Sequence, residues 1–188
     1  MRYKALLSVV FFFCVVYSLD AQSAWIRSDK TDAFSGDPYS EFILAGHYIQ
    51  APSKGEDAIP QITLRCRDRP ANKQKVFRGD FLNAHLSTGT VLDRATSGNV
   101  SVVFRLDDGK PQTDVWAIST DGTAIFFNDV TLDTLLWGHF MPHKENTSPP
   151  VKKIVLMLDE AFAGKIVMQF DMPDPSVVSE MCGVTIHR

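Results

Sequence analysis

The sequence contains few of the features by which an enzyme or a nucleic-acid-binding protein is usually recognised. It has three cysteines in 188 residues, no long block of like charges and no low-complexity tract. It contains no G-x-S-x-G nucleophile motif, phosphate-binding loop or dinucleotide-binding glycine pattern. No cluster of cysteine and histidine has the spacing of a zinc site. The net charge of −3 argues against nucleic acid as the main partner.

The first 23 residues have the pattern of a secretory signal peptide. Arg2 and Lys4 give a positive start, an apolar run of 15 residues covers 5–19, and small residues follow at 21–24. A membrane-spanning helix needs about 20 apolar residues, so a membrane anchor, the alternative, is disfavoured. We therefore predict a signal peptide over residues 1–23, with cleavage near Ser23. The mature protein would have no stable membrane span and would lie in the periplasm or outside the cell.

The predicted mature chain, residues 24–188, has the length of a single domain. Its 165 residues are enough to bury a sizeable core, and loss of the signal peptide changes the net charge from −3 to −4. Two cysteines remain, Cys66 and Cys182, and an even pair in an exported protein is most simply a disulfide. Such a bond across 116 positions would stabilise the fold by about 4–5 kcal/mol. Two free buried thiols are the alternative.

Strand patterns dominate the mature chain. Ile62, Leu64 and Cys66 alternate with polar residues, which is the period of a half-buried strand. Asp-Gly pairs at 108–109 and 121–122 predict tight turns, because glycine accepts positive φ at little cost. The predicted strands cover 42–50, 62–67, 100–105, 115–119, 124–127, 153–158 and 165–171.

Two short helices are also predicted. Asp129 could cap a helix that runs to about Trp137, and Asp174 could cap a second one that ends at Gly183. The expected fold class is therefore mainly β, an antiparallel sheet or β-sandwich with one or two short helices and one disulfide.

Residues with catalytic potential are scattered. His139 and His143 have a spacing that can chelate a metal on a helix, but Pro142 argues against a helix there, so structural or surface roles are favoured. Residues 78–80 spell the adhesion tripeptide Arg-Gly-Asp, which we interpret as a polar turn. Paired carboxylates such as Asp107 and Asp108 are explained by turns. We predict no catalytic residue, no metal and no cofactor.

The segment 105–127 is richer in functional side chains than the rest of the chain. Around two consecutive turns it carries Arg105, Asp107, Lys110, Trp116, Ser119, Thr120 and Asp121. One interpretation is a recognition surface built on the tryptophan. The favoured interpretation is structural, with the tryptophan in the core and the hydroxyl and carboxylate groups bonded to turn amides.

The same segment resembles a family of exported bacterial domains that includes the VasI/TagO-type accessory proteins of type VI secretion. The shared residues are Arg65, Cys66, Arg105, Asp107, Lys110, Trp116, Ser119, Thr120, Asp121, Ala124, Phe126, Phe170, Asp171 and Cys182. The resemblance covers roughly residues 60 to 183. It implies a periplasmic β-rich domain with a Cys66–Cys182 bridge and no established enzymatic activity.

Three functions follow as expectations. The first is a non-enzymatic exported protein that binds an envelope or secreted protein partner, including as a secretion accessory factor. The second is an inhibitor of a hydrolase such as a lysozyme or protease, which a protruding, rigid loop rich in contact residues would favour. The third is a carboxylate-dependent hydrolase, which requires converging groups in a concave pocket.

Overall fold

A computed structural model describes residues 24–52, 58–67, 81–92, 98–128, 151–161 and 164–174, together with Val178 and Cys182. The predicted signal peptide and the first predicted helix lie outside these residues. All ten strands of the described part belong to one antiparallel sheet. The strands are β1 (Ile26–Thr31), β2 (Pro38–Ala45), β3 (His47–Gln50), β4 (Gln61–Arg67), β5 (Phe81–Ser87), β6 (Asn99–Leu106), β7 (Gln112–Ile118), β8 (Ala124–Phe126), β9 (Lys153–Asp159) and β10 (Lys165–Asp171).

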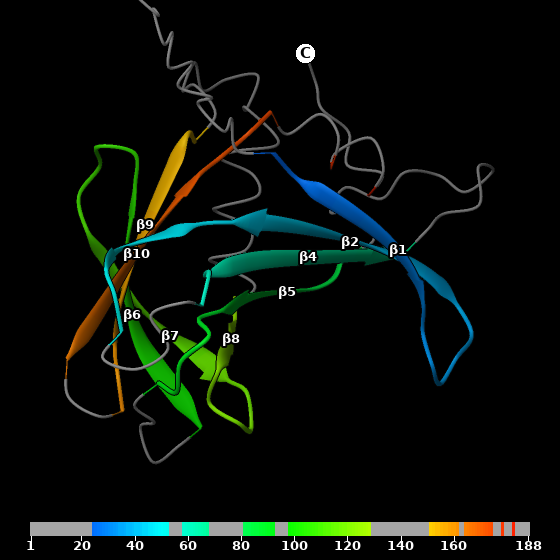
Figure 1. The fold of residues 1–188 in the computed structure, drawn as a ribbon, viewed down its shortest axis with the longest axis horizontal. Coiled ribbons are helices and arrows are strands. Elements are labelled where there is room, and N and C mark those ends of the chain that lie inside the picture. Colours follow the sequence, from blue (N-terminus) through cyan, green and yellow to red (C-terminus); the bar gives the residue numbers. More distant parts are fainter. Residues whose placement is uncertain are drawn as a thin grey trace, which may run out of the picture.

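The sheet order is β1-β2-β4-β5-β8-β7-β6-β9-β10-β3, so the consecutive strands β2 and β3 lie near opposite ends of the sheet. The predicted strand over 42–50 is therefore two strands, which meet at Gly46. A Cβ at position 46 would lie 2.5 Å from the Phe170 ring and 2.7 Å from the Gln169 carbonyl oxygen, so only glycine fits at this corner. Figure 1 shows the strands β1, β2, β4 and β5 crossing β6, β9 and β10 at a steep angle. The bend at Gly46 lets the chain leave one of these two packed layers and enter the other.

The core lies between the two crossing parts of the sheet. Alternate residues of the predicted strands point into it, such as Val100, Val102 and Phe104 of β6, which are all at most 5% exposed. One apolar cluster joins residues of both parts, including Phe42 and Leu64 from β2 and β4 with residues of β6, β9 and β10. Burial of each large apolar side chain contributes about 1.5–3 kcal/mol. The prediction of a mainly β fold is confirmed.

The turn between β6 and β7 forms at the predicted Asp-Gly pair, but the glycine does not have the expected positive φ. The residue with positive φ is Asp107, at 48°, and not Gly109. Gly109 is instead required by a close approach, because a Cβ there would lie 2.9 Å from the Leu106 carbonyl oxygen. The Gly109 amide donates to that same oxygen and closes the turn.

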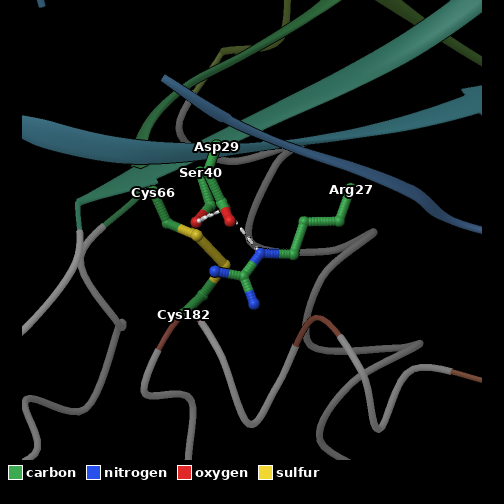
Figure 2. The surroundings of a disulfide bond; sticks show 5 residues. All are labelled: Arg27, Asp29, Ser40, Cys66 and Cys182. Atoms are coloured by element: carbon green, nitrogen blue, oxygen red, sulfur yellow. Dashed lines mark hydrogen bonds and ion pairs between the residues drawn. A yellow bond between two sulfur atoms is a disulfide. The ribbon is translucent and has the colours of Figure 1, made fainter. Parts of the chain in front are cut away.

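A disulfide joins Cys66 of β4 to Cys182, with the two Cα atoms 5.5 Å apart, which confirms this prediction. Figure 2 shows Asp29 and Ser40, from β1 and β2, beside the disulfide, with the guanidinium of Arg27 pointing toward it. Asp29 accepts hydrogen bonds from Arg27 Nε at 2.6 Å and Ser40 Oγ at 2.9 Å. These two bonds hold the pKa of Asp29 below its ordinary value. The disulfide therefore ties the C-terminal segment to the end of the sheet where β1, β2 and β4 lie.

Only Val178 and Cys182 of the second predicted helix are described after Asp174. The Cys182 amide donates to the Val178 carbonyl oxygen at 2.8 Å, which is the spacing of a helical turn. Both side chains are buried against the core.

Candidate functional site

The seven motif residues predicted around the two turns do not converge on one site. Asp107 has a structural role, since its carboxylate accepts hydrogen bonds from the amides of Lys152 and Lys153 at 2.9 and 2.8 Å. The Asp107 amide in turn donates to the Lys153 carbonyl oxygen. Asp107 thereby fastens the β6–β7 turn to the start of β9.

Trp116 is fully buried in the core. Its ring packs against Phe127, with ring centroids 4.7 Å apart, and its Nε1 donates to the Asp114 carboxylate at 2.9 Å. Asp114 also accepts a hydrogen bond from Asn128 at 2.7 Å. This polar tether fixes the orientation of the indole, so the tryptophan is not available to a partner in the folded protein.

Ser119 and Asp121 organise the second turn. The Asp121 carboxylate accepts hydrogen bonds from Ser119 Oγ at 2.6 Å and from the Thr123 amide at 3.0 Å. These bonds, with that of Ser119 the stronger influence, lower the pKa of Asp121 to about 2. Thr120 lies exposed at the turn.

The two motif cations lie on the surface. Arg105 is exposed on the outer side of β6, and Lys110 is exposed in the turn that follows. The predicted motif is thus divided between core, turns and surface. His139, His143 and the Arg78–Asp80 tripeptide lie outside the described residues.

A different feature stands out, the hairpin formed by β1, β2 and the loop of residues 32–37. In Figure 1 this loop projects from the sheet as an open blue hairpin. At its tip Phe34 is fully exposed, with a relative exposure of 102%. Single exposed apolar side chains are common on protein surfaces, but Phe34 is the most exposed of the large apolar side chains in the described part of the chain. We call residues 32–37 the tip loop.

The tip loop is held by hydrogen bonds although its surface is exposed. Asp32 Oδ1 accepts from the amides of Phe34 at 2.9 Å and Ser35 at 2.8 Å, which is the bonding of an aspartate-initiated turn. The Asp32 carbonyl oxygen accepts from Gly36, whose φ of 73° is unfavourable for other residues. The Asp32 amide donates to the Asp37 carbonyl oxygen and closes the loop. The backbone that carries Phe34 is therefore held in one conformation.

Charged side chains occupy the outer face of the sheet next to the tip loop. The Glu41 side chain, only 4% exposed, forms ion pairs with Lys30 and with Arg65, the latter at 2.6 Å between Arg65 Nε and the carboxylate. Both cations keep water contact, with side-chain exposures of 46% and 37%. The Arg65 guanidinium lies 5.9 Å from the centre of the Tyr39 ring.

The protonation state of Glu41 follows from these contacts. Burial raises the pKa of Glu41, but the hydrogen bonds and charges of Lys30 and Arg65 outweigh it and leave the pKa below the ordinary value. At neutral pH the three groups carry two positive charges and one negative charge. The same hairpin also carries Arg27, Asp29, Asp32 and Asp37, so charges of both signs are mixed around its base.

His85 and Phe126 continue this outer face on β5 and β8. They are paired in the strand register, and their rings are 5.9 Å apart. His85 Nδ1 has no hydrogen-bond partner among the described residues. Burial, with the nearby charge of Arg65, lowers the pKa of His85, so it is neutral at pH 7. We call the surface made by the tip loop with Lys30, Tyr39 and Arg65 the hairpin face.

The hairpin face is composed of residue types that are common in contact surfaces. Glu41 is ionised and shielded, so it is poorly placed to act as a general acid. No group of three metal-ligating side chains occurs in the described part of the chain. Arginine and aromatic side chains on a rigid surface are the residue types that dominate protein–protein contacts.

Another buried carboxylate, Glu160, also belongs to the fold's internal bonding. Thr90 Oγ1 donates to Glu160 Oε1 at 3.2 Å, and Thr88 Oγ1 donates to the Thr90 carbonyl oxygen at 2.8 Å. Tyr48 of β3 donates to the Thr88 carbonyl oxygen. These contacts hold β3 and Glu160, which follows β9, against the loop that follows β5.

Comparison with protein-family models, curated proteins and solved structures finds no match to this chain. Among the described residues, no helix is long and apolar enough to cross a membrane. The likeness to type VI secretion accessory proteins therefore stays a prediction from the sequence.

Proposed function

We propose that this chain is an exported, non-enzymatic binding protein that recognises a protein partner through the hairpin face. The observation that carries the proposal is the tip loop, which presents the fully exposed Phe34 in a hydrogen-bonded conformation. A pre-organised loop backbone loses little conformational entropy on binding, so more of the contact energy of Phe34 contributes to affinity.

The disulfide supports the exported location. Disulfides persist in the periplasm and outside the cell and are rare in the reducing cytosol. The Cys66–Cys182 bond, together with the predicted signal peptide, supports a periplasmic or secreted protein. A secretion accessory role is the finer form of the proposal and depends on the sequence resemblance alone.

The mixed charges at the base of the hairpin support a partner surface of mixed charge. Lys30 and Arg65 surround one carboxylate and keep exposed surface of their own. Charges at the rim of an interface mainly steer association, while a central aromatic anchor supplies affinity. Phe34 can supply an aromatic anchor at the tip, with the charges of Lys30 and Arg65 to one side of it.

Inhibition of a hydrolase is the second candidate, and the tip loop is the observation that favours it. Inhibitors that block an active site commonly insert a rigid, protruding loop whose shape changes little on binding. A loop with an exposed aromatic tip and internal hydrogen bonds meets that requirement.

In-cell crosslinking followed by purification and mass spectrometry tests the proposal. The wild-type chain is compared with Phe34→Ala and with a control, Ile49→Ala, whose side chain is 57% exposed on β3. We expect a partner that is recovered with the wild type and the control but lost with Phe34→Ala. Several envelope components would support the accessory role, and a single hydrolase would support inhibition. Equal recovery with all three proteins would refute the proposal.

A structural control accompanies this experiment. Because Phe34 is fully exposed, its replacement should leave the melting temperature unchanged within about 1–2 °C, which corresponds to less than about 0.5 kcal/mol. Loss of binding without loss of stability then identifies Phe34 as a contact residue.

A further inference from the structure

The outer face of β6, β9 and β10 carries a group of apolar side chains at its centre. On β9 the residues Ile154, Leu156 and Leu158 are buried in the core, and the intervening Val155 and Met157 point outward. A strand with one face in water normally alternates with polar residues, and a strand that is apolar on both sides is usually covered on both. The sequence of β9 is therefore that of a strand with a second apolar contact.

Neighbouring strands extend the apolar surface. In the strand register Met157 pairs with Val103 of β6 on one side and with Val167 of β10 on the other. Directly opposite residues of an antiparallel pair share a face, so these three side chains form a row across the strands. With Val155 they make up a surface that we call the apolar row, and each side chain in it is partly exposed.

Four charges at the ends of β9 and β10 alternate in sign around the apolar row, and Arg105 of β6, which pairs with Val155, adds a fifth charge beside it. Lys153 begins β9 and Asp159 ends it, and Lys165 begins β10 and Asp171 ends it. Because the two strands are antiparallel, Lys153 pairs with Asp171 at one end and Asp159 pairs with Lys165 at the other. Signs therefore alternate around a rectangle about 20 Å long, from six steps at roughly 3.3 Å each. Figure 1 shows β9 and β10, the two long sides of this rectangle, next to each other.

This rectangle is complementary to itself. A two-fold axis parallel to the face and along the strands places the β10 of one copy over the β9 of the other, so Lys153 faces the second copy's Asp171. An axis across the strands places Lys153 over the second copy's Asp159. In both arrangements each lysine faces an aspartate, and Met157 faces an apolar residue of the second copy, Val167 in the first and Val155 in the second.

We propose that a second copy of this chain packs against the apolar row, face to face, to form a two-fold symmetric dimer. The contact has an apolar centre and a charged rim, which is the usual anatomy of a protein interface. Two stacked sheets pack about 10 Å apart with their strands roughly aligned, which brings the outward side chains into contact. Lys153 lies 3.8 Å from the exposed Asp108 within its own chain and keeps one-third of its side-chain surface for the partner.

The oligomeric state of the purified, disulfide-bonded protein is the first test. We expect a dimer by analytical ultracentrifugation and a monomer for Met157→Glu, which places two carboxylates near the axis. The control Ile26→Glu changes a 60% exposed residue on β1 and should leave the dimer intact. A monomeric wild type, or a dimer that survives Met157→Glu, would overturn the proposal. Circular dichroism and the melting temperature confirm that each variant is folded.

Charge reversal tests the complementarity itself. Asp159→Lys sets like charges against each other and should weaken the dimer at least about tenfold. Reversal of all four charges, with Asp at 153 and 165 and Lys at 159 and 171, restores opposite signs and should restore the dimer. The fully reversed chain should also fail to form mixed dimers with the wild type. A dimer that is indifferent to the single reversal, or that is not recovered by the full reversal, would contradict this arrangement.

Discussion

Replacement of Glu41 by glutamine tests whether the buried carboxylate stabilises the hairpin face. The change keeps the volume and removes the negative charge from between Lys30 and Arg65. Breaking a fully buried ion pair costs about 3–5 kcal/mol, and breaking an exposed one costs about 0–1 kcal/mol. Glu41 is buried but its two cations are 46% and 37% exposed, so water can solvate them after the change. We therefore expect a loss of about 1–2 kcal/mol at pH 7 and a melting temperature lower by roughly 2–8 °C.

The same variant should change how stability depends on pH. The pKa of Glu41 in the folded protein lies below its ordinary value of 4.5, so its ionisation stabilises the fold above about pH 4.5. That contribution is lost as the pH falls through the lower, folded pKa. The stability difference between wild type and Glu41→Gln should therefore shrink on acidification.

Urea denaturation at pH 7 and at several acidic pH values measures both effects. Asp108→Asn, which changes a carboxylate that is 99% exposed, is the control and should alter stability by less than about 0.5 kcal/mol. A Glu41→Gln protein as stable as the wild type at pH 7 would show that the ion pairs contribute nothing. A difference that stays constant with pH would show that charge is not its cause.

Three further predictions concern the core and its fastenings. Replacement of both Cys66 and Cys182 by alanine should lower the free energy of unfolding by about 4–5 kcal/mol, given the separation of 116 residues; a loss under about 1 kcal/mol in urea denaturation would contradict this. Trp116→Ala should cost about 3–5 kcal/mol because the ring is fully buried, and a variant with an unchanged melting temperature would mean that the tryptophan is not in the core. Gly46→Ala should cost at least about 1–3 kcal/mol because its Cβ would collide with the Phe170 ring, and thermal melting at wild-type temperature would exclude this account of the corner.

Alternation and cysteine number were sufficient to predict the fold class. Val100, Val102 and Phe104 have one apolar face, which identifies the strand and its buried side without any partner. The predicted mature chain has two cysteines, which allow one intramolecular pairing, so the Cys66–Cys182 disulfide could be predicted from the sequence. Alternation can be recognised within one strand, and the number of cysteines can be counted. Neither requires knowledge of how the strands pair.

The corner at Gly46 and the role of Trp116 depend on contacts between distant residues. The apolar residues continue on both sides of Gly46, so the sequence does not show a break there. The bend becomes evident only from the close approach of Gly46 to the Phe170 ring. Val115 and Trp116 are adjacent and both apolar, so the sequence leaves open which of them faces the core. The structure buries the tryptophan and exposes 57% of the valine.

The hairpin face was missed for a similar reason. An aromatic residue in a short polar segment such as 32–37 has no distinctive pattern, and its exposure depends on where the hairpin points. Glu41 and Arg65 are 24 positions apart and meet only because β2 and β4 pair in one register. The one available signal was Asp32 with Gly36 between two strand-like segments, which indicates an organised turn.

Site-specific crosslinking from position 34 in living cells tests the central claim most directly. A photoreactive residue replaces Phe34 in one strain and the exposed Ile49 in another, and crosslinked products are identified by mass spectrometry. Recognition through the tip loop predicts a discrete adduct with another protein from position 34 and no adduct with that protein from position 49. The absence of an adduct at 34, or the same adducts at both positions, would contradict it.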